Sequence, residues 1–162
     1  SYTGLRIGLS AAKGLCFALD VPLIALSTLE VLAAELRATG TALNDTDTLH
    51  PMIDARRMEV FTGTLEGRGG GDGPARPAIL DDAWCLALTT DRRHIVFGDG
   101  ADKATALWAA HPRIMHVAGI RPSVEGLAAR AHATFLRKDF ADLTRLVPDY
   151  GKEANVTRPG TK

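Results

Sequence analysis

The chain has 162 residues, of which 46% are hydrophobic and 23% are charged, a composition typical of a folded globular protein and not of a disordered one. Lys plus Arg and Asp plus Glu number 19 each, and the resulting net charge of zero argues against direct binding of nucleic acid, which usually needs a basic patch. The apolar runs are far shorter than the roughly 20 residues that span a bilayer, so we expect no membrane partner.

The two cysteines, Cys16 and Cys85, both lie among apolar residues. This context predicts reduced core thiols of a cytoplasmic protein, and neither a disulfide framework nor a metal site. The chain opens without Met at what reads as a junction between a turn and a helix, with no signal-peptide pattern. We therefore expect a fragment that lacks an N-terminal part.

The first predicted element is a helix from Thr3, its expected N-cap, to about Leu19, where Asp20 and Pro22 end it. One apolar stripe consists of Leu5, Leu9, Ala12 and Cys16, and a second consists of Ile7, Ala11, Leu15 and Ala18. Only Arg6, Ser10 and Lys13 interrupt this apolar surface. A helix that is apolar on most sides needs a second neighbour besides the rest of its own domain.

Gly4, Gly8 and Ala12 recur every four residues of this helix, so a second backbone could approach closely along that line. Glycine inside a helix costs about 1 kcal/mol relative to alanine, and a helix with three glycines therefore suggests a packing demand. We expect a partner interface made of Thr3, Gly4, Leu5, Arg6, Gly8, Leu9, Ala12, Lys13 and Cys16.

Residues 22–26 predict a short buried strand, and residues 27–30, Ser-Thr-Leu-Glu, form a capping box for a second helix that stops at Gly40. The buried residues expected on this helix are Leu29, Leu32, Ala33 and Leu36. A helix, a strand and a helix in quick succession indicate α/β layering.

Residues 41–48 read as a polar linker, after which residues 49–53 and 58–65 predict a β-hairpin with a turn at 54–57. In its second strand, Val60, Thr62 and Thr64 alternate with Phe61 and Gly63. Residues 67–77 hold five glycines and two prolines, which predicts a mobile loop.

The remaining elements alternate between helix and strand. We expect helices at 81–88 and 101–110, a buried strand at 94–97, and an edge strand at 114–117. Ser123 opens a last helix, and an irregular tail covers residues 142–162. The inner stripe predicted for the last helix is Leu127, Ala131, Thr134 and Phe135.

Few residues suggest chemistry. Gly98-Asp99-Gly100 joins a strand to a helix but lacks the third glycine of a dinucleotide fingerprint and the lysine of a P-loop, so a tight turn is the better interpretation. The histidines show no zinc-binding spacing and are expected on the surface or in loops: His50, His94, His111, His116 and His132. Ser10 and Ser27 lack a nucleophile motif.

The hairpin tip carries Asp54, Arg56, Arg57 and Glu59. This cluster is either a recognition loop or a set of solvated ion pairs, which contribute little to stability. The sequence pattern alone favours the solvated interpretation.

Residues 1–15, Ser-Tyr-Thr-Gly-Leu-Arg-Ile-Gly-Leu-Ser-Ala-Ala-Lys-Gly-Leu, resemble the TsaB (YeaZ) family, in which this segment follows a Gly-Pro-Gly. The similarity continues at Pro22-Leu23 and 27–30, and it returns at 53–61, where the family has Asp-Ala-Arg-Arg followed by Glu-Val-Tyr. It also includes residues 98–101 and the closing Pro148, Tyr150 and 155–157 (Asn-Val-Thr), while residues 62–94 are nearly featureless.

This resemblance implies an α/β protein with the actin-like, Hsp70-like ATPase fold (the ASKHA type, ribonuclease H-like), degenerate and here with an incomplete first lobe. We expect residues 1–40 to be the remainder of the N-terminal lobe and residues 41–162 to be the C-terminal lobe.

The resemblance also implies a non-catalytic subunit required for threonylcarbamoylation of adenosine 37 in tRNA. Such a subunit dimerises with its catalytic paralogue TsaD, and the ATPase TsaE binds to the pair. We expect a homodimer in isolation, only indirect contact with tRNA, and no catalytic, metal-binding or cofactor-binding residues. The competing hypothesis is a glycoprotease-like metallopeptidase of the M22 type, which the missing histidine pair disfavours.

Overall fold

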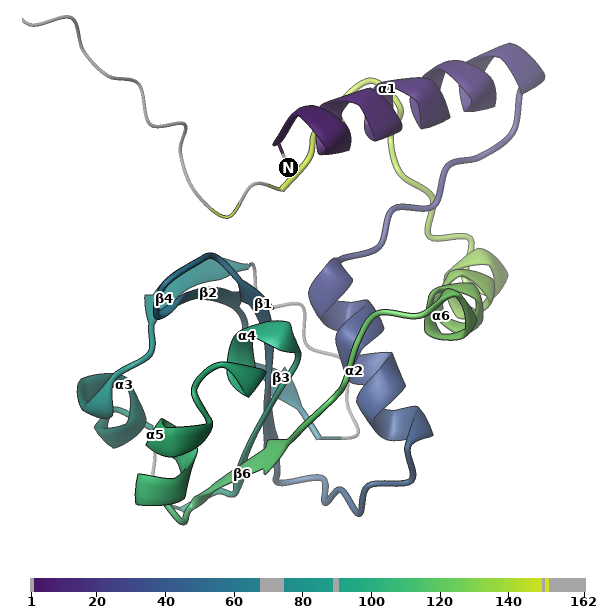
Figure 1. The fold of residues 1–162 in the computed structure, drawn as a ribbon. Coiled ribbons are helices and arrows are strands. Elements are labelled where there is room, and N and C mark those ends of the chain that lie inside the picture. Colours follow the sequence, from purple (N-terminus) through teal and green to yellow (C-terminus); the bar gives the residue numbers. More distant parts are fainter. Residues whose placement is uncertain (1, 68–74, 89–90, 150, 152–162) are drawn as a thin grey trace, which may run out of the picture.

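The computed structural model of the protein describes residues 2–67, 75–88, 91–149 and 151. Six strands form one mixed sheet with the order β4-β2-β1-β5-β6, and the short β3 pairs with β1 (Figure 1). The strands span Thr48–Asp54 (β1), Glu59–Thr62 (β2), Leu65–Glu66 (β3), Arg76–Ile79 (β4), His94–Phe97 (β5) and Ile114–Val117 (β6). The helices span Tyr2–Leu19 (α1), Thr28–Ala38 (α2), Asp82–Leu86 (α3), Asp99–Asp102 (α4), Thr105–Ala110 (α5) and Val124–Leu136 (α6).

The centre of the sheet is parallel and one side of it is antiparallel. β1 pairs in parallel with β5 and β5 with β6, while β2 runs antiparallel to β1 and β4. The predicted strands at 49–53, 94–97 and 114–117 are confirmed, the last of them at the sheet edge.

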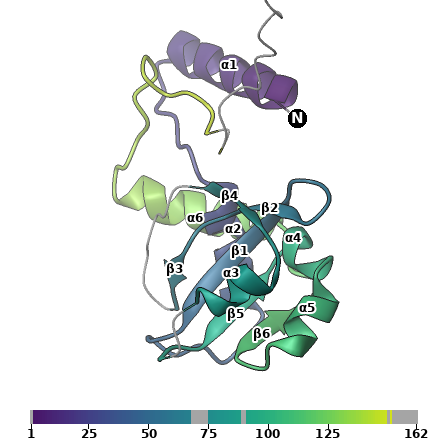
Figure 2. The ribbon, with the colours of Figure 1, turned by 90° about the vertical axis from the view of Figure 1, so that its left-hand side faces the viewer.

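Helices cover both faces of this sheet (Figures 1 and 2). One face packs on α2 through a core that includes Leu32, Leu36 and Phe97. The other face packs on α3, α4 and α5 through a second core that includes Val96 and Trp108. Because both of its faces are covered, all four residues of β5 are buried, as is usual for a central parallel strand.

The hairpin of β1 and β2 is confirmed, with Val60 and Thr62 buried as the alternation predicts. Its second strand is shorter than expected, because β3 is a separate strand that pairs with the start of β1. β4 was not predicted: it pairs with β2 at the edge of the sheet, where Pro77 is tolerated because an edge strand can spare a backbone donor. Most of the predicted glycine-rich loop, residues 68–74, lies outside the described residues.

The capping residues predicted for α2 and α6 are confirmed. Ser27 accepts a hydrogen bond from the Leu29 amide at 3.3 Å, and Ser123 accepts one from the Gly126 amide at 3.0 Å. The residues predicted to be buried on α2 are buried, and Gly40, just beyond its end, has a φ of +75°.

The inner stripe predicted for α6 is partly wrong, since Leu127 is 47% exposed and Phe135 is 52% exposed. The physical reason is that α6 packs on the single helix α2, which covers only a narrow line that includes Gly126 and Thr134. Two polar contacts join these helices: the Ser123 hydroxyl donates to Glu35, and Arg130 pairs with Glu30 at 2.8 Å.

The single helix predicted at 101–110 is also wrong, because the chain forms α4 and then α5. The indole of Trp108 donates a hydrogen bond to the Ala101 carbonyl at 2.8 Å, which satisfies a backbone acceptor where the two helices separate. The predicted linker at 41–48 contains an unexpected ion pair, in which Asp47, 1% exposed, binds the partly exposed Arg93.

α1 stands apart from the sheet and its covering helices (Figures 1 and 2). It ends at Leu19 as predicted, but it already includes Thr3, so Thr3 lies in the first turn and is not its N-cap. The strand predicted at 22–26 is wrong: only Leu23 makes a bridge, to Ala141, and no residue of the segment is fully buried. In the described chain no strand lies beside the segment to extend that bridge into a ladder.

The hairpin turn contains two consecutive residues in the left-handed region, Arg56 with a φ of +74° and Arg57 with a φ of +49°. This region costs a residue with a β-carbon roughly 1–2 kcal/mol, a cost that glycine avoids. The turn is closed by backbone hydrogen bonds from Ala55 to Glu59 and from Glu59 to Arg56, both 3.0 Å.

Candidate partner interface

α1 borders a groove of about 750 Å³ whose other walls come from distant parts of the chain. The lining residues are Gly4, Leu5, Gly8, Leu9 and Ala12 of α1, residues 23–29, Ile53, Ala75, and residues 146–149. Five of the nine residues predicted for the partner interface therefore lie together on one face of the helix. No sequence signal indicated that the segment at 146–149 runs beside α1.

Two side-chain contacts join α1 to described residues beyond the helix. The Lys13 ammonium donates to the Leu146 carbonyl at 3.0 Å, and the Cys16 thiol lies 3.8 Å from the Pro22 carbonyl oxygen. Lys13 and Cys16 are both predicted interface residues, and each of them contacts another segment of this same chain. Cys16 is half-buried on α1 and outside both cores, so the prediction that it is a core residue is wrong; Cys85 is a core residue.

Apolar side chains are exposed to solvent around much of the circumference of α1. Ile7 is 66% exposed, Leu15 63% and Phe17 83%. Single exposed apolar residues are common, but a contiguous apolar surface on a soluble protein usually marks a site of interaction. Thr3 and Arg6, the two other predicted interface residues, are exposed as well.

Gly8 is open on its Cα side: a β-carbon built there would meet no atom within 4 Å. The close approach that the glycine spacing suggests is therefore not made by the described residues of this chain. The interface assignment itself stays a prediction, and the structure adds that the space beside Gly8 is free.

The turn at 98–100 has a packing role. Gly98 has a φ of +101°, and a β-carbon there would lie 2.3 Å from the Met52 carbonyl oxygen. A β-carbon at Gly100 would lie 2.8 Å from a methyl carbon of Val60. Asp99 turns its carboxylate to the hairpin and accepts a hydrogen bond from the Asp54 amide at 3.0 Å. These contacts explain both glycines by the close approach of α4 to β1, in line with the tight-turn interpretation.

Two histidines are placed where the sequence did not predict them. His50 and His94 are each 4% exposed, on neighbouring strands, and His50 Nε2 lies 2.9 Å from His94 Nδ1. The Trp84 ring stands edge-on to His50. Burial, and secondarily the neighbouring His94, lowers the pKa of His50 to about 4, so His50 is neutral at physiological pH.

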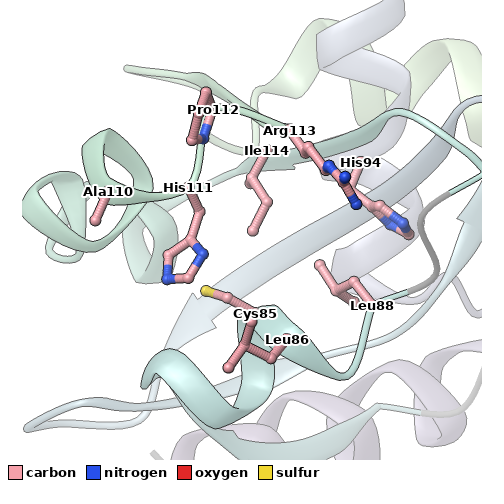
Figure 3. Close-up of a pocket in the computed structure, with 9 residues that line it drawn as sticks. All are labelled: Cys85, Leu86, Leu88, His94, Ala110, His111, Pro112, Arg113 and Ile114. Carbon is pink, nitrogen blue, oxygen red and sulfur yellow. The ribbon is translucent and has the colours of Figure 1, made fainter.

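A second pocket, of about 350 Å³, lies at the amino ends of β5 and β6 (Figure 3). Figure 3 shows the side chains of Cys85 and His111 pointing toward one another, with Arg113 near His94. Burial raises the pKa of Cys85 to about 11, which keeps it a thiol and makes it a poor nucleophile. His111 is held by Asp82 at 2.8 Å.

In the described residues no three His, Cys, Asp or Glu side chains come close enough together to hold a metal ion. Of the helices in the same part of the chain, none has the length and apolarity needed to cross a bilayer.

Comparisons with known proteins identify the family. The model of the family "TsaD: tRNA N6-adenosine threonylcarbamoyltransferase" matches residues 1–83, half of the chain. The chain is 35% identical over 161 residues to the tRNA threonylcarbamoyladenosine biosynthesis protein TsaB of Bacillus subtilis. That alignment covers 93% of this chain but 64% of the relative's length, so the chain spans less than two thirds of that protein.

Two solved structures are similar. YeaZ from Pseudomonas aeruginosa superposes with a TM-score of 0.62 at 25% identity, over 93% of this chain and 70% of that one. A protein described as similar to the peptidase YeaZ from Pseudomonas aeruginosa gives 0.62 at 24% identity, over 94% and 69%, and supports the fold alone. The predicted fold, an α/β protein of the actin-like ASKHA type, is confirmed. The chain belongs to the family of the TsaD model and, within it, to the TsaB (YeaZ) proteins.

Proposed function

We propose that this chain is a cytoplasmic, non-catalytic subunit of the machinery that installs threonylcarbamoyl on adenosine 37 of tRNA. It acts by pairing through α1 with a TsaD-type catalytic paralogue, and a TsaE-type ATPase joins that pair. The name of the Bacillus subtilis relative, a tRNA threonylcarbamoyladenosine biosynthesis protein, supports the process. Contact with tRNA is indirect.

One observation carries the mode of action: α1 is an 18-residue helix that is apolar on most sides and covered by its own chain on one side only. Figure 1 shows how far it stands from the sheet. Leu5, 52% exposed, and Leu15, 63% exposed, lie on the same face of α1 as Gly8. Burying apolar surface contributes roughly 25 cal/mol per Å², so a second helix laid on that face would be strongly favoured. In isolation, a second copy of this chain takes the partner's place and gives a homodimer.

The sharpest test is Gly8→Arg, because Gly8 faces open space and lies within the predicted interface. The substitution removes a helix-interior glycine, worth about 0.8–1.0 kcal/mol of helix propensity, so it leaves the folding of this chain intact. Burying an unpaired guanidinium against a partner costs about 3 kcal/mol, or roughly a hundredfold in affinity. We expect Gly8→Arg, and Leu9→Arg beside it, to abolish pairing with the TsaD-type protein and tRNA modification in a reconstituted reaction.

Ser10→Arg is the matched control, since Ser10 is an exposed polar residue of the same helix and receives the same charge. It should leave pairing and modification unchanged. If Gly8→Arg supports modification at the wild-type rate, α1 is not the pairing surface.

The metallopeptidase alternative is less supported. The described residues contain no cluster of metal ligands on which to build such a site. Chelator-sensitive proteolysis with stoichiometric bound metal in the purified protein would revive it.

A further inference from the structure

The tip of the β1–β2 hairpin presents two exposed arginines, of which Arg56 interacts electrostatically with Asp54. Arg56 and Arg57 are exposed, and within the described chain neither guanidinium has a hydrogen bond or an ion pair. The neighbouring carboxylate of Asp54 is already taken by the Lys103 ammonium. The tip therefore ends in two guanidinium groups that are available to a ligand.

The backbone of these arginines is strained, and the strain is larger than the turn requires. The other left-handed residues that are not glycine, among those described, are Asp20 and Lys138, which follow the ends of α1 and α6 and help to terminate those helices. The hairpin turn also needs left-handed residues, but Asn or Gly would adopt them at lower cost. Strained residues of this kind concentrate at functional sites. Two in succession at a solvent-exposed tip indicate a role for the side chains themselves.

The tip also lies on the side of the molecule that faces α1. Ile53, which precedes the turn, lines the groove beside Gly4 and Gly8. Figures 1 and 2 both show β1 running toward α1, with the hairpin at the near end of the sheet. A protein that covers α1 and extends toward the sheet would reach the tip.

The charges around the tip select the chemistry of its ligand. Guanidinium groups bind carboxylates and phosphates through paired hydrogen bonds. The Asp54 carboxylate accepts a hydrogen bond from the Arg56 amide at 2.8 Å, and the Asp99 carboxylate accepts one from the Asp54 amide at 3.0 Å. The base of the turn thus carries carboxylates that disfavour a polyanion such as RNA, and the chain as a whole has no net charge. A few carboxylates on a protein surface fit this mixed environment better.

We infer that Arg56 and Arg57 bind acidic side chains of the protein that pairs with α1, an inference that rests on the proposed function. The two contacts differ in kind: α1 supplies apolar area, and the hairpin tip supplies charge-dependent affinity and orientation.

The test is the double variant Arg56→Asn/Arg57→Gly, which removes both guanidinium groups and places residues in the turn that accept left-handed backbone. Its matched control is Arg92→Asn/Arg113→Asn, which removes two exposed arginines on another part of the surface. Affinity for the TsaD-type partner is measured by calorimetry at low and high salt, and thermal unfolding of each variant is followed alone. We expect the hairpin variant to unfold no earlier than wild type and to bind about tenfold more weakly at low salt, a difference that narrows at high salt.

Three results would overturn the inference: affinity within twofold of the control at low salt, a loss of affinity that salt does not change, or a lower unfolding temperature that accounts for the loss. Weaker binding of tRNA by the isolated chain, with partner affinity unchanged, would assign the arginines to RNA instead and also overturns it. The two proposals fail on different variants. If Gly8→Arg leaves pairing intact, the proposed α1 interface is wrong. If Arg56→Asn/Arg57→Gly leaves the partner affinity unchanged, only the inference on the hairpin is wrong.

Discussion

At the scale of single residues, burial decides the chemistry of His50 more than its sequence neighbours do. An imidazole with 4% exposure beside a second buried imidazole cannot hold a proton easily, and its pKa falls to about 4 from an ordinary 6.5. The unfolded chain therefore binds this proton more tightly than the folded chain does. Stability is complete above pH 6.5 and falls as the pH drops toward 4, by at most about 3 kcal/mol.

We expect the free energy of unfolding, measured in urea between pH 7.5 and 5, to decline in the wild type and to stay flatter in His50→Gln. The buried carboxylate of Asp47 does not titrate in this pH range, because the Arg93 hydrogen bond holds its pKa below the usual value. Asp47 therefore changes the stability only at lower pH. His132→Gln, at an exposed position, is the control and should keep the wild-type slope. An equal slope in wild type and His50→Gln would contradict the assignment.

At the scale of elements, the sequence pattern predicted the helix caps and the strands that depend on residues close together in the chain. The strands around Leu49, Val60 and Ile95 and the caps at Ser27 and Ser123 were predictable, because side-chain alternation and capping act within a few residues. The segment at 22–26 has the composition of a buried strand but lacks neighbouring strands, and pairing is a property of the sheet.

Contacts that depend on where distant segments meet had no local signal. The pairing of His50 with His94 requires β1 and β5 to be neighbours in register, and the groove beside α1 requires residues 146–149 to return to it. Of the predicted interface, the sequence pattern found the face of α1 but not its other walls.

The turn after β5 offers a prediction at the same scale. Gly100→Ala keeps an accessible backbone conformation, yet its methyl group would lie 3.0 Å or less from backbone carbons of Met52 and Ile53 and from Val60. Because a paired strand cannot shift cheaply, we expect the substitution to destabilise the protein by about 1–3 kcal/mol. Gly8→Ala, with open space around it, should be neutral or stabilising by up to about 1 kcal/mol. Urea unfolding of both variants measures these changes in the free energy of unfolding. Equal changes in the two variants would mean that α4 does not pack as closely on β1 as described.

At the scale of the whole molecule, the hydrophobic cores and the exposed apolar helix are separate. Neither core contains a residue of α1: one joins α2 to the sheet, and the other joins α3, α4 and α5 to it. The domain boundary predicted near residue 40 stays a prediction, and α2, on its N-terminal side, shares a core with β1 and β5. The sheet and its covering helices contain both hydrophobic cores, while most of the apolar surface of α1 is exposed to solvent.

Removal of α1 should therefore separate folding from association. A variant that begins at Pro22 loses the Lys13 contact to Leu146 but no residue of either core, so it should still unfold cooperatively, within a few degrees of the full chain. It should also lose self-association: by light scattering we expect the full chain at about twice its 17.2 kDa mass and the shortened chain as a monomer. Non-cooperative unfolding of the shortened chain would show that α1 is needed for folding. A shortened chain that still dimerises would place the self-contact elsewhere, and the hairpin tip and the exposed side of α6 would then be the surfaces to examine by substitution.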